Sequence, residues 1–398
     1  MGILSTKRVA SLLAAGVSVA ALASLPGSAS AACTPITGQG ATLQDLAQNR
    51  LWIPLSTGCN GNITYNPTSS GTGLTAWSAN GAITPSADSY IATDEAPTAS
   101  QITNMTTAAG SSIEVIPVAQ AAVAVIVNLP ANCVPSGAGS LRADPAALQD
   151  AYDSETATFW DLFPGQLREN VAGACRVLVR PYARNRDSGT TRIFKNYLNI
   201  ADPGNWSGDT NGSVTWPAGS LATANATAGS GGALVDLVNA NDGTIGYANL
   251  ADALGRGLDN TPGANGFWVL LKSANGTWSD PRTGDDLSGY TSNCDSTPYS
   301  SAPTTTTNAD WSSTYGVSLT ATNYGMCALT FDIAYTKQYQ RISSPARTFN
   351  QGDTASQYLQ YVVSAIGGQL LLNTGNYAPL PGSIQTTAAA GAALVNTL

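Results

Sequence analysis

The chain has 398 residues, of which 17 are Lys or Arg and 25 are Asp or Glu, so its formal net charge is −8. A surface with this excess of negative charge repels nucleic acid and anionic membranes, and we predict neither as a partner. Histidine is absent. This excludes Ser-His-Asp and Cys-His catalysis and histidine zinc sites, so the composition favours binding over catalysis, with no metal and no cofactor.

The N-terminal residues have the pattern of a secretory signal. The basic pair Lys7-Arg8 precedes the apolar run Val9–Leu25, and Ala29-Ser30-Ala31 offers a small-residue cleavage site. We therefore predict that residues 1–31 are removed and that the mature chain is periplasmic or secreted. An uncleaved anchor is less favoured because the run is short for a span of about 20 residues. A lipoprotein attached at Cys33 is less favoured because serine stands where its signal normally has leucine.

Without the signal the chain has about 367 residues (398 − 31) and a net charge of −10 (15 − 25). Six cysteines remain, and an even number in an exported chain favours three disulfides over free thiols or a metal site. We predict pairing between neighbours, because the members of each pair lie in one region of the sequence. The predicted pairs are Cys33–Cys59, Cys133–Cys175 and Cys294–Cys327.

Strand-like and helix-like runs alternate along the chain, which is typical of α/β proteins. The length suggests two domains or lobes. No second apolar run is long enough to cross a membrane. The predicted elements in chain order are buried strands over 113–118, 122–128 and 176–180, helices over 144–152, 190–198 and 231–238, and surface loops over 203–232 and 291–316.

Four short segments share a chemistry suited to a small oxyanion. Each combines glycine, hydroxyl or charged residues near a turn or a helix start, where unpaired N–H groups and a partial positive charge attract anions. Each alone is common in ordinary turns, and Asp94 alone fits a helix cap. The four segments are Gly38–Thr42, Thr68–Gly73, Ala92–Pro97 and Arg184–Thr190.

Together these segments resemble the phosphate-binding protein of bacterial high-affinity phosphate ABC transporters. Gly38-Gln-Gly-Ala-Thr42 is similar to that family's Gly-Ala-Gly-Ala-Thr, and Arg184…Ser188-Gly-Thr190 is similar to its Arg-x-x-x-Ser-Gly-Thr. The likeness extends nearly from end to end. The other similar segments, in the family's order, are Tyr65…Ser69-Ser70-Gly71, Ala92-Thr-Asp94…Pro97, Val214–Pro217, Gly243–Tyr247 and Tyr377–Pro381.

The resemblance implies a two-lobed α/β periplasmic binding protein fold of type II, with two crossing hinge strands and the ligand in the interlobe cleft. Mapped onto this chain, the crossings fall near Val125 and Thr330. Lobe one then comprises 32–125 and 330–398, and lobe two comprises 126–329. The predicted disulfides would each lie within one lobe and leave hinge closure free.

The resemblance also implies roles for individual residues. Thr42, the Leu43 amide and Ser69 would hold the anion from lobe one, and Asp94 would accept a hydrogen bond from it. Arg184 would supply the positive charge, and Ser188, Gly189 and Thr190 would donate from a helix start in lobe two. Further candidates are Ser70, Arg186 and Asp187.

Two departures from the family pattern concern these residues. Leu43 stands where the family usually has phenylalanine, and Arg186 stands where it commonly has aspartate two residues after the arginine. Either Asp187 supplies the missing carboxylate, or Arg186 rather than Arg184 contacts the anion.

The function implied is extracytoplasmic capture of hydrogen phosphate for an ABC permease, by a monomer. A secreted phosphate scavenger or regulator without a permease is the alternative. A phosphatase is less favoured because the sequence lacks histidine, a clear two-metal carboxylate cluster and a Gly-x-Ser-x-Gly segment.

Overall fold

The computed structural model describes residues 33–397, except for 57–58, 60, 79–87, 154–155, 202, 223–227, 264–265, 274, 284–290, 295–298, 315–316, 320–321 and 339–348. The predicted signal peptide, residues 1–31, lies outside the described residues. No helix within the described ranges has both the length and the apolar character needed to cross a membrane.

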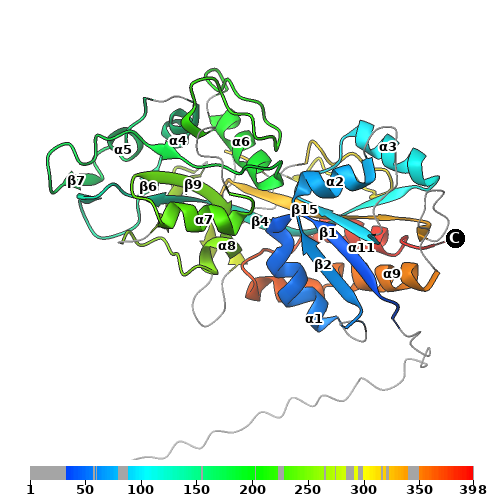
Figure 1. Ribbon diagram of the computed structural model, residues 1–398. Coiled ribbons are helices and arrows are strands. Elements are labelled where there is room, and N and C mark those ends of the chain that lie inside the picture. Colours follow the sequence, from blue (N-terminus) through cyan, green and yellow to red (C-terminus); the bar gives the residue numbers. More distant parts are fainter. Residues whose placement is uncertain are drawn as a thin grey trace, which may run out of the picture.

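The frame is an eight-stranded mixed sheet in the order β2-β1-β3-β15-β4-β9-β8, with β10 also beside β4. Helices cover it, so the predicted α/β class is confirmed (Figure 1). The strands are β1 (Ile36–Gly40), β2 (Ile63–Pro67), β3 (Tyr90–Thr93), β4 (Ile113–Asn128), β8 (Arg180–Pro181), β9 (Thr244–Asn249), β10 (Phe267–Trp268) and β15 (Cys327–Tyr335).

Strand β4 belongs to both halves of the sheet. Its first part pairs with β15, from Ile113↔Tyr335 to Ala122↔Cys327, and its last part pairs with β9, from Val123↔Asn249 to Asn128↔Thr244. All 16 residues of β4 are buried, as expected for a strand covered on both faces. The two halves of the molecule are therefore joined by one continuous strand.

The prediction of two separate strands, 113–118 and 122–128, is wrong because the intervening residues stay paired and buried. Gln120 exchanges backbone hydrogen bonds with Ala378, and its Nε2 donates to the Pro379 carbonyl at 2.8 Å. Pro117 cannot donate to a sheet ladder, and the register shifts beside it, between Thr330 and Phe331.

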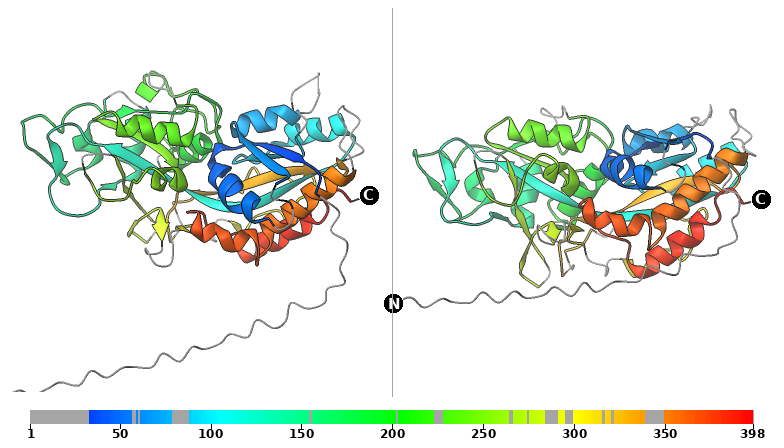
Figure 2. Two further views of the ribbon diagram at one scale, coloured as in Figure 1. Left: turned by 60° about the horizontal axis from the view of Figure 1, so that its bottom comes forward. Right: turned by 90° about the horizontal axis from the view of Figure 1, so that it is seen from below.

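We call the segments on the β1 side of β4 the first half and those on the β9 side the second half (Figure 1). In the first half, α9 and α11 lie side by side along the sheet (Figure 2). The helices of the first half are α1 (Ile53–Leu55), α2 (Ser70–Ser78), α3 (Ala99–Ala109), α9 (Phe349–Val363), α10 (Gly368–Leu371) and α11 (Gly382–Ala392). Those of the second half are α4 (Pro145–Asp153), α5 (Phe159–Leu162), α6 (Gly189–Ala201), α7 (Gly231–Asn239) and α8 (Leu250–Leu254).

The helices predicted over 144–152, 190–198 and 231–238 are confirmed as α4, α6 and α7. The strand predicted over 176–180 is wrong, because only Arg180 of that run enters a strand. Val177 and Leu178 are 42% and 47% exposed. The three consecutive apolar residues 177–179 lie in a loop after Cys175 in which only Val179 is buried, so a short apolar run does not by itself identify a buried strand.

The three predicted disulfides, Cys33–Cys59, Cys133–Cys175 and Cys294–Cys327, are all present. Cys327 is the first residue of β15, so the third disulfide lies beside the two long strands that join the halves.

Much of the predicted surface loop 291–316 packs against the first half. The hydroxyls of Thr306 and Thr307 donate to the Glu114 carboxylate, at 2.5 and 2.8 Å. Trp311 is fully buried, with its ring centroid 5.9 Å from that of Phe331. Polar composition gave no sign of these contacts, because the hydroxyls are satisfied by one buried carboxylate.

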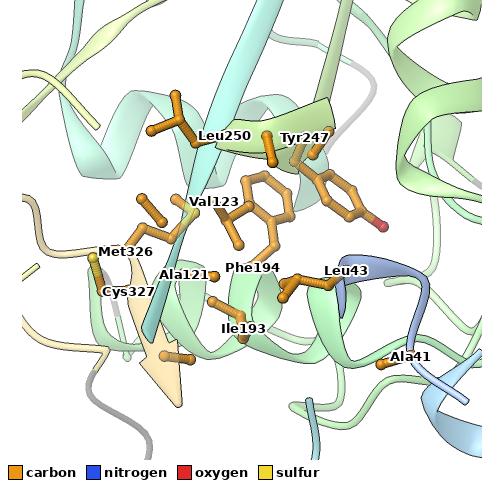
Figure 3. Close-up of a cluster of buried hydrophobic side chains, with 14 of the residues drawn as sticks. Ala41, Leu43, Ala121, Val123, Ile193, Phe194, Tyr247, Leu250, Met326 and Cys327 are labelled. Atoms are coloured by element: carbon orange, nitrogen blue, oxygen red, sulfur yellow. The ribbon is translucent and has the colours of Figure 1, made fainter. Parts of the chain in front are cut away.

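A cluster of buried apolar side chains fills the junction between the halves (Figure 3). It includes Leu43 from the first half, Val123 of β4, Met326 directly before β15, and Phe194 and Tyr247 from the second half. Phe194 and Tyr247 stack with their centroids 4.3 Å apart. Leu43 therefore packs in the junction, where its side chain fills space instead of forming an aromatic wall.

Gly40, the last residue of β1, supplies a first test. It has φ +140°, and a Cβ added there would lie 1.9 Å from the Ala92 carbonyl oxygen. We expect Gly40→Ala to lower the free energy of unfolding by about 2–4 kcal/mol, because backbone cannot move aside cheaply. Gly61→Ala is the matched control, since that position has open space, and its effect should stay within about 0.5 kcal/mol. Urea unfolding of both variants measures the difference, and equal losses would contradict the steric account.

Candidate anion-binding site

Three of the predicted segments converge because they follow parallel strands. β1 pairs in parallel with both β2 and β3, with Gly40 opposite Pro67 and Ala92. The carboxyl ends of parallel strands meet at one edge of a sheet, which is where α/β proteins bind ligands. Thr42, Ser69 and Asp94 each follow the end of one of these strands, so the fold brings them to one edge.

Asp94 is a buried carboxylate held by two hydroxyls. Its Oδ1 accepts from Thr330 Oγ1 at 2.9 Å, and its Oδ2 accepts from Ser70 Oγ at 3.1 Å. Burial raises the pKa of Asp94 to about 6, against the opposing effects of these hydrogen bonds and of Arg184. Asp94 is thus fixed in orientation and poorly solvated, which favours contact with a proton-bearing partner.

Arg184 brings a buried positive charge to the same place. It is 1% exposed, and its Nη1 donates to Ser188 Oγ at 3.0 Å and to Thr42 Oγ1 at 3.4 Å. Its Nη2 donates to the Gly229 carbonyl at 2.8 Å. Within the described residues its Nε has no hydrogen-bond partner, and no carboxylate lies within 4.0 Å of it. Burial lowers the pKa of Arg184.

The start of α6 lies directly against Asp94. A Cβ added at Gly189 would be 2.3 Å from the Asp94 Cβ, so only glycine permits this approach. Ser188 and Thr190 are both buried. The N-terminal end of this 13-residue helix, which carries a partial positive charge, therefore points towards Asp94 in the first half.

Not every predicted donor is free. The Ser188 amide donates to the Gly212 carbonyl at 2.9 Å, so in this conformation Ser188 offers only its hydroxyl. Ser69 Oγ accepts from the Thr72 amide at 3.1 Å and so caps the start of α2. Ser69 therefore caps a helix as well as lining the candidate site, and the Ser188 amide is already used within the second half.

The two arginines predicted as alternatives have different positions. Arg184 is buried at the centre, whereas Arg186 and Asp187 are exposed. Both exposed residues line a hollow of 610 Å³ that also contacts Ser69 and Thr72. The geometry therefore favours Arg184 as the central cation and leaves Arg186 at the rim.

A second hollow, of 470 Å³, lies on the Thr42 side and is lined by residues of both halves, including Ser230 and Asn249. Sequence reasoning assigned no binding role to several residues around the site, because they are distant in sequence from the four predicted segments. Tyr247 is one, since its hydroxyl lies 2.7 Å from Thr191 Oγ1 and accepts from the Arg184 amide at 3.4 Å. Thr330 is another, since the family resemblance places it only at a hinge crossing and the structure adds its hydrogen bond to Asp94.

The comparisons with known proteins agree with this architecture. Residues 26–365 match the family model described as the PBP superfamily domain. Among curated proteins, none matches the sequence.

Solved structures of phosphate-binding proteins share the fold. A high-affinity periplasmic phosphate-binding protein, PfluDING, bound with phosphate, has 19% identity and a TM-score of 0.62, over 90% of this chain and 93% of that one. The ancestral soluble variant of the Human Phosphate Binding Protein has 16% identity and a TM-score of 0.63, with the same coverage. The phosphate-binding protein from Stenotrophomonas maltophilia has 15% identity and a TM-score of 0.58, again over 90% and 93%.

The raised pKa of Asp94 predicts a pH-dependent effect of Asp94→Asn on the phosphate-free protein. A shift from 3.8 to about 6 corresponds to about 3 kcal/mol in the free energy of unfolding. The native state binds the proton more tightly than the unfolded state, so this stability is present at low pH and is lost as pH rises through about 6. We expect Asp94→Asn to gain stability over the wild type between pH 4 and pH 7.5 in urea unfolding. A difference that does not change with pH would contradict an ionised, buried Asp94.

Proposed function

Because the chain belongs to the PBP superfamily, we propose that it is an extracytoplasmic solute-binding protein that captures inorganic phosphate, as hydrogen phosphate, between its two halves. The solved structures that share its fold include a phosphate-binding protein with phosphate bound. The proposal assigns the contacts to Thr42, the Leu43 amide, Ser69, Asp94, Arg184, Ser188, Gly189 and Thr190.

One observation carries this proposal: the buried Arg184 guanidinium lies near the buried Asp94 carboxylate without forming an ion pair with it. A buried cation is stable only when an opposite charge or several hydrogen-bond acceptors balance it. An oxyanion between Arg184 and the start of α6 supplies that balance. Arg184 Nε has no hydrogen-bond partner among the described residues, which supports a contact between this donor and the anion.

Asp94 then selects among oxyanions. A carboxylate next to a bound anion is tolerated only if the anion donates a hydrogen to it. Hydrogen phosphate has such a hydrogen, whereas sulfate presents only acceptors and leaves two acceptors facing each other. Thr330 and Ser70 occupy one lone pair of each Asp94 oxygen and so fix where the ligand's hydrogen must lie.

We also propose that the two halves act as lobes that close on the ligand, with β4 and β15 as the hinge. We keep the sequence-based boundaries of lobe one (32–125 with 330–398) and lobe two (126–329), with one change. Residues 306–311 are assigned to lobe one, because they contact Glu114 and Phe331. Delivery to an ABC permease from the periplasm, by a monomer, is the leading biological role. A secreted scavenger with the same site is the alternative.

Calorimetric titration of phosphate-stripped protein tests the proposed ligand. About eight charge-assisted hydrogen bonds, less the cost of association, give an affinity of about micromolar or tighter for phosphate. We expect sulfate to bind at least about a hundredfold more weakly. In Asp94→Asn the ratio should move towards sulfate. Absence of heat with phosphate would refute the proposal, and an unchanged ratio would remove Asp94 from the site.

The two arginines are separated by a matched pair of substitutions. We expect Arg184→Gln to weaken phosphate binding by about a hundredfold or more, because it removes a buried charge that contacts the anion. Arg186→Gln removes the same charge from an exposed position and should change the equilibrium affinity less than about threefold. The reverse order of effects would make Arg186 the ligand contact.

A further inference from the structure

One ion pair connects the two halves beside the candidate site. Glu95 follows Asp94 in the first half, and Arg192 lies in the first turn of α6 in the second half. Arg192 Nη1 lies 3.5 Å from Glu95 Oε2, and the two side chains are only 15% and 11% exposed. The other ion pairs among the described residues lie within the second half.

The second half encloses the rest of the Glu95 carboxylate. Its Oε1 is buried and has no hydrogen-bond partner within the described residues. A Cβ added at Gly212 would lie 2.0 Å from this oxygen and 2.6 Å from Asp187 Oδ1. Glu95 therefore lies beside its ion-pair partner Arg192, within electrostatic range of a second cation, Lys195, and near two carboxylates, Asp187 and its neighbour Asp94. Burial and both of these carboxylates raise the pKa of Glu95 to about 7, and Arg192 opposes the rise.

A fixed loop holds Gly212 in this position. Lys195, on α6, is fully buried, and its Nζ donates to Asp209 Oδ1 at 2.8 Å and to the Ser213 carbonyl at 2.9 Å. Its Nζ also lies 4.8 Å from the centroid of the Trp216 ring. The Gly212 carbonyl in turn accepts from the Ser188 amide. The loop that places Gly212 against Glu95 is thus hydrogen-bonded to the start of α6, which also lines the site.

We propose that Arg192 is the positioning residue that permits closure, by neutralising Glu95 as the halves meet, and that the Glu95–Arg192 pair sets how long the bound anion is retained. In an open form both groups would be hydrated. Closure removes that water, and a buried carboxylate near two others is unfavourable unless its cation arrives with it. This inference rests on the proposed phosphate binding and adds the contact that controls release.

A double-mutant cycle on phosphate release tests the pair. At pH 8, where Glu95 is ionised, we expect Arg192→Gln to raise the dissociation rate by about tenfold or more, because it leaves a buried carboxylate unpaired. Glu95→Gln also removes the partner of Arg192, but Asp187 stays within electrostatic range of that arginine, so this variant should change the rate less. The double variant should behave like Glu95→Gln alone, and the association rate should change less than about threefold throughout.

Two comparisons separate this role from a general loss of structure. The effect of Arg192→Gln should shrink at pH 6, where Glu95 is mostly protonated. Arg176→Gln, which removes an exposed arginine paired with Glu169, should leave release unchanged. Additive effects in the cycle, or an unchanged release rate in Arg192→Gln, would overturn the inference while leaving phosphate binding intact.

A second readout does not depend on phosphate. Fluorescence energy transfer between dyes on exposed positions of α3 and of the β7 segment (Leu167–Glu169) reports the separation of the halves. Arg192→Gln should shift the ligand-free protein towards longer separations of the halves at pH 8. Adding Glu95→Gln to this variant should restore the shorter separations. If the wild type binds no phosphate, this measurement still decides the role of the pair, and unchanged transfer in Arg192→Gln would refute it.

Discussion

Within the part of the chain that the structure describes, the buried Arg184 guanidinium has no carboxylate within 4.0 Å, and this is the constraint around which the site is organised. Thr42, Ser188 and Gly229 supply hydrogen-bond acceptors, but none of them supplies a negative charge. Such an arrangement is stable when an anion completes it. The parallel strands β1, β2 and β3 place the remaining groups opposite the arginine, and Gly189 lets α6 approach within contact of Asp94. Strand order and charge therefore define one site together.

Sequence reasoning was most successful where the signal was local. Helices α4, α6 and α7 have periodic apolar faces with clear starts, and the cysteine pairs lie close together along the chain. It failed where burial depended on distant partners. The break predicted within β4 is absent because Gln120 is satisfied by Ala378 and Pro379, about 260 residues further along. The loop around Thr306 is buried because Glu114 accepts from its hydroxyls.

The same division applies to the site. Hydroxyl and glycine residues at strand ends and at a helix start were identifiable from motifs, since motif and geometry coincide there. Thr330 and Gly212 were not identifiable, because each reaches the site from a separate segment with an ordinary sequence. The segment Gly243–Tyr247 was noticed, but its sequence did not show that the Tyr247 hydroxyl contacts the Arg184 amide. The choice between Arg184 and Arg186 also needed the structure, because two arginines two residues apart differ only in which one the fold buries.

The path of the chain through the sheet also has a consequence for the order of folding. β15 lies between β3 and β4, so the first half is complete only after residues 327–335 have been added, and α9 and α11 come later still. The elements of the second half from α4 to β12 (Trp278–Ser279) form one continuous stretch of sequence. When the N-terminal part of the chain is made first, the second half can therefore fold before the first half. Strands β1 to β3 complete their sheet only when β15, the last strand in sequence, has been made. Until β15 pairs with β3, that edge of β3 has unpaired backbone groups and can pair with another chain.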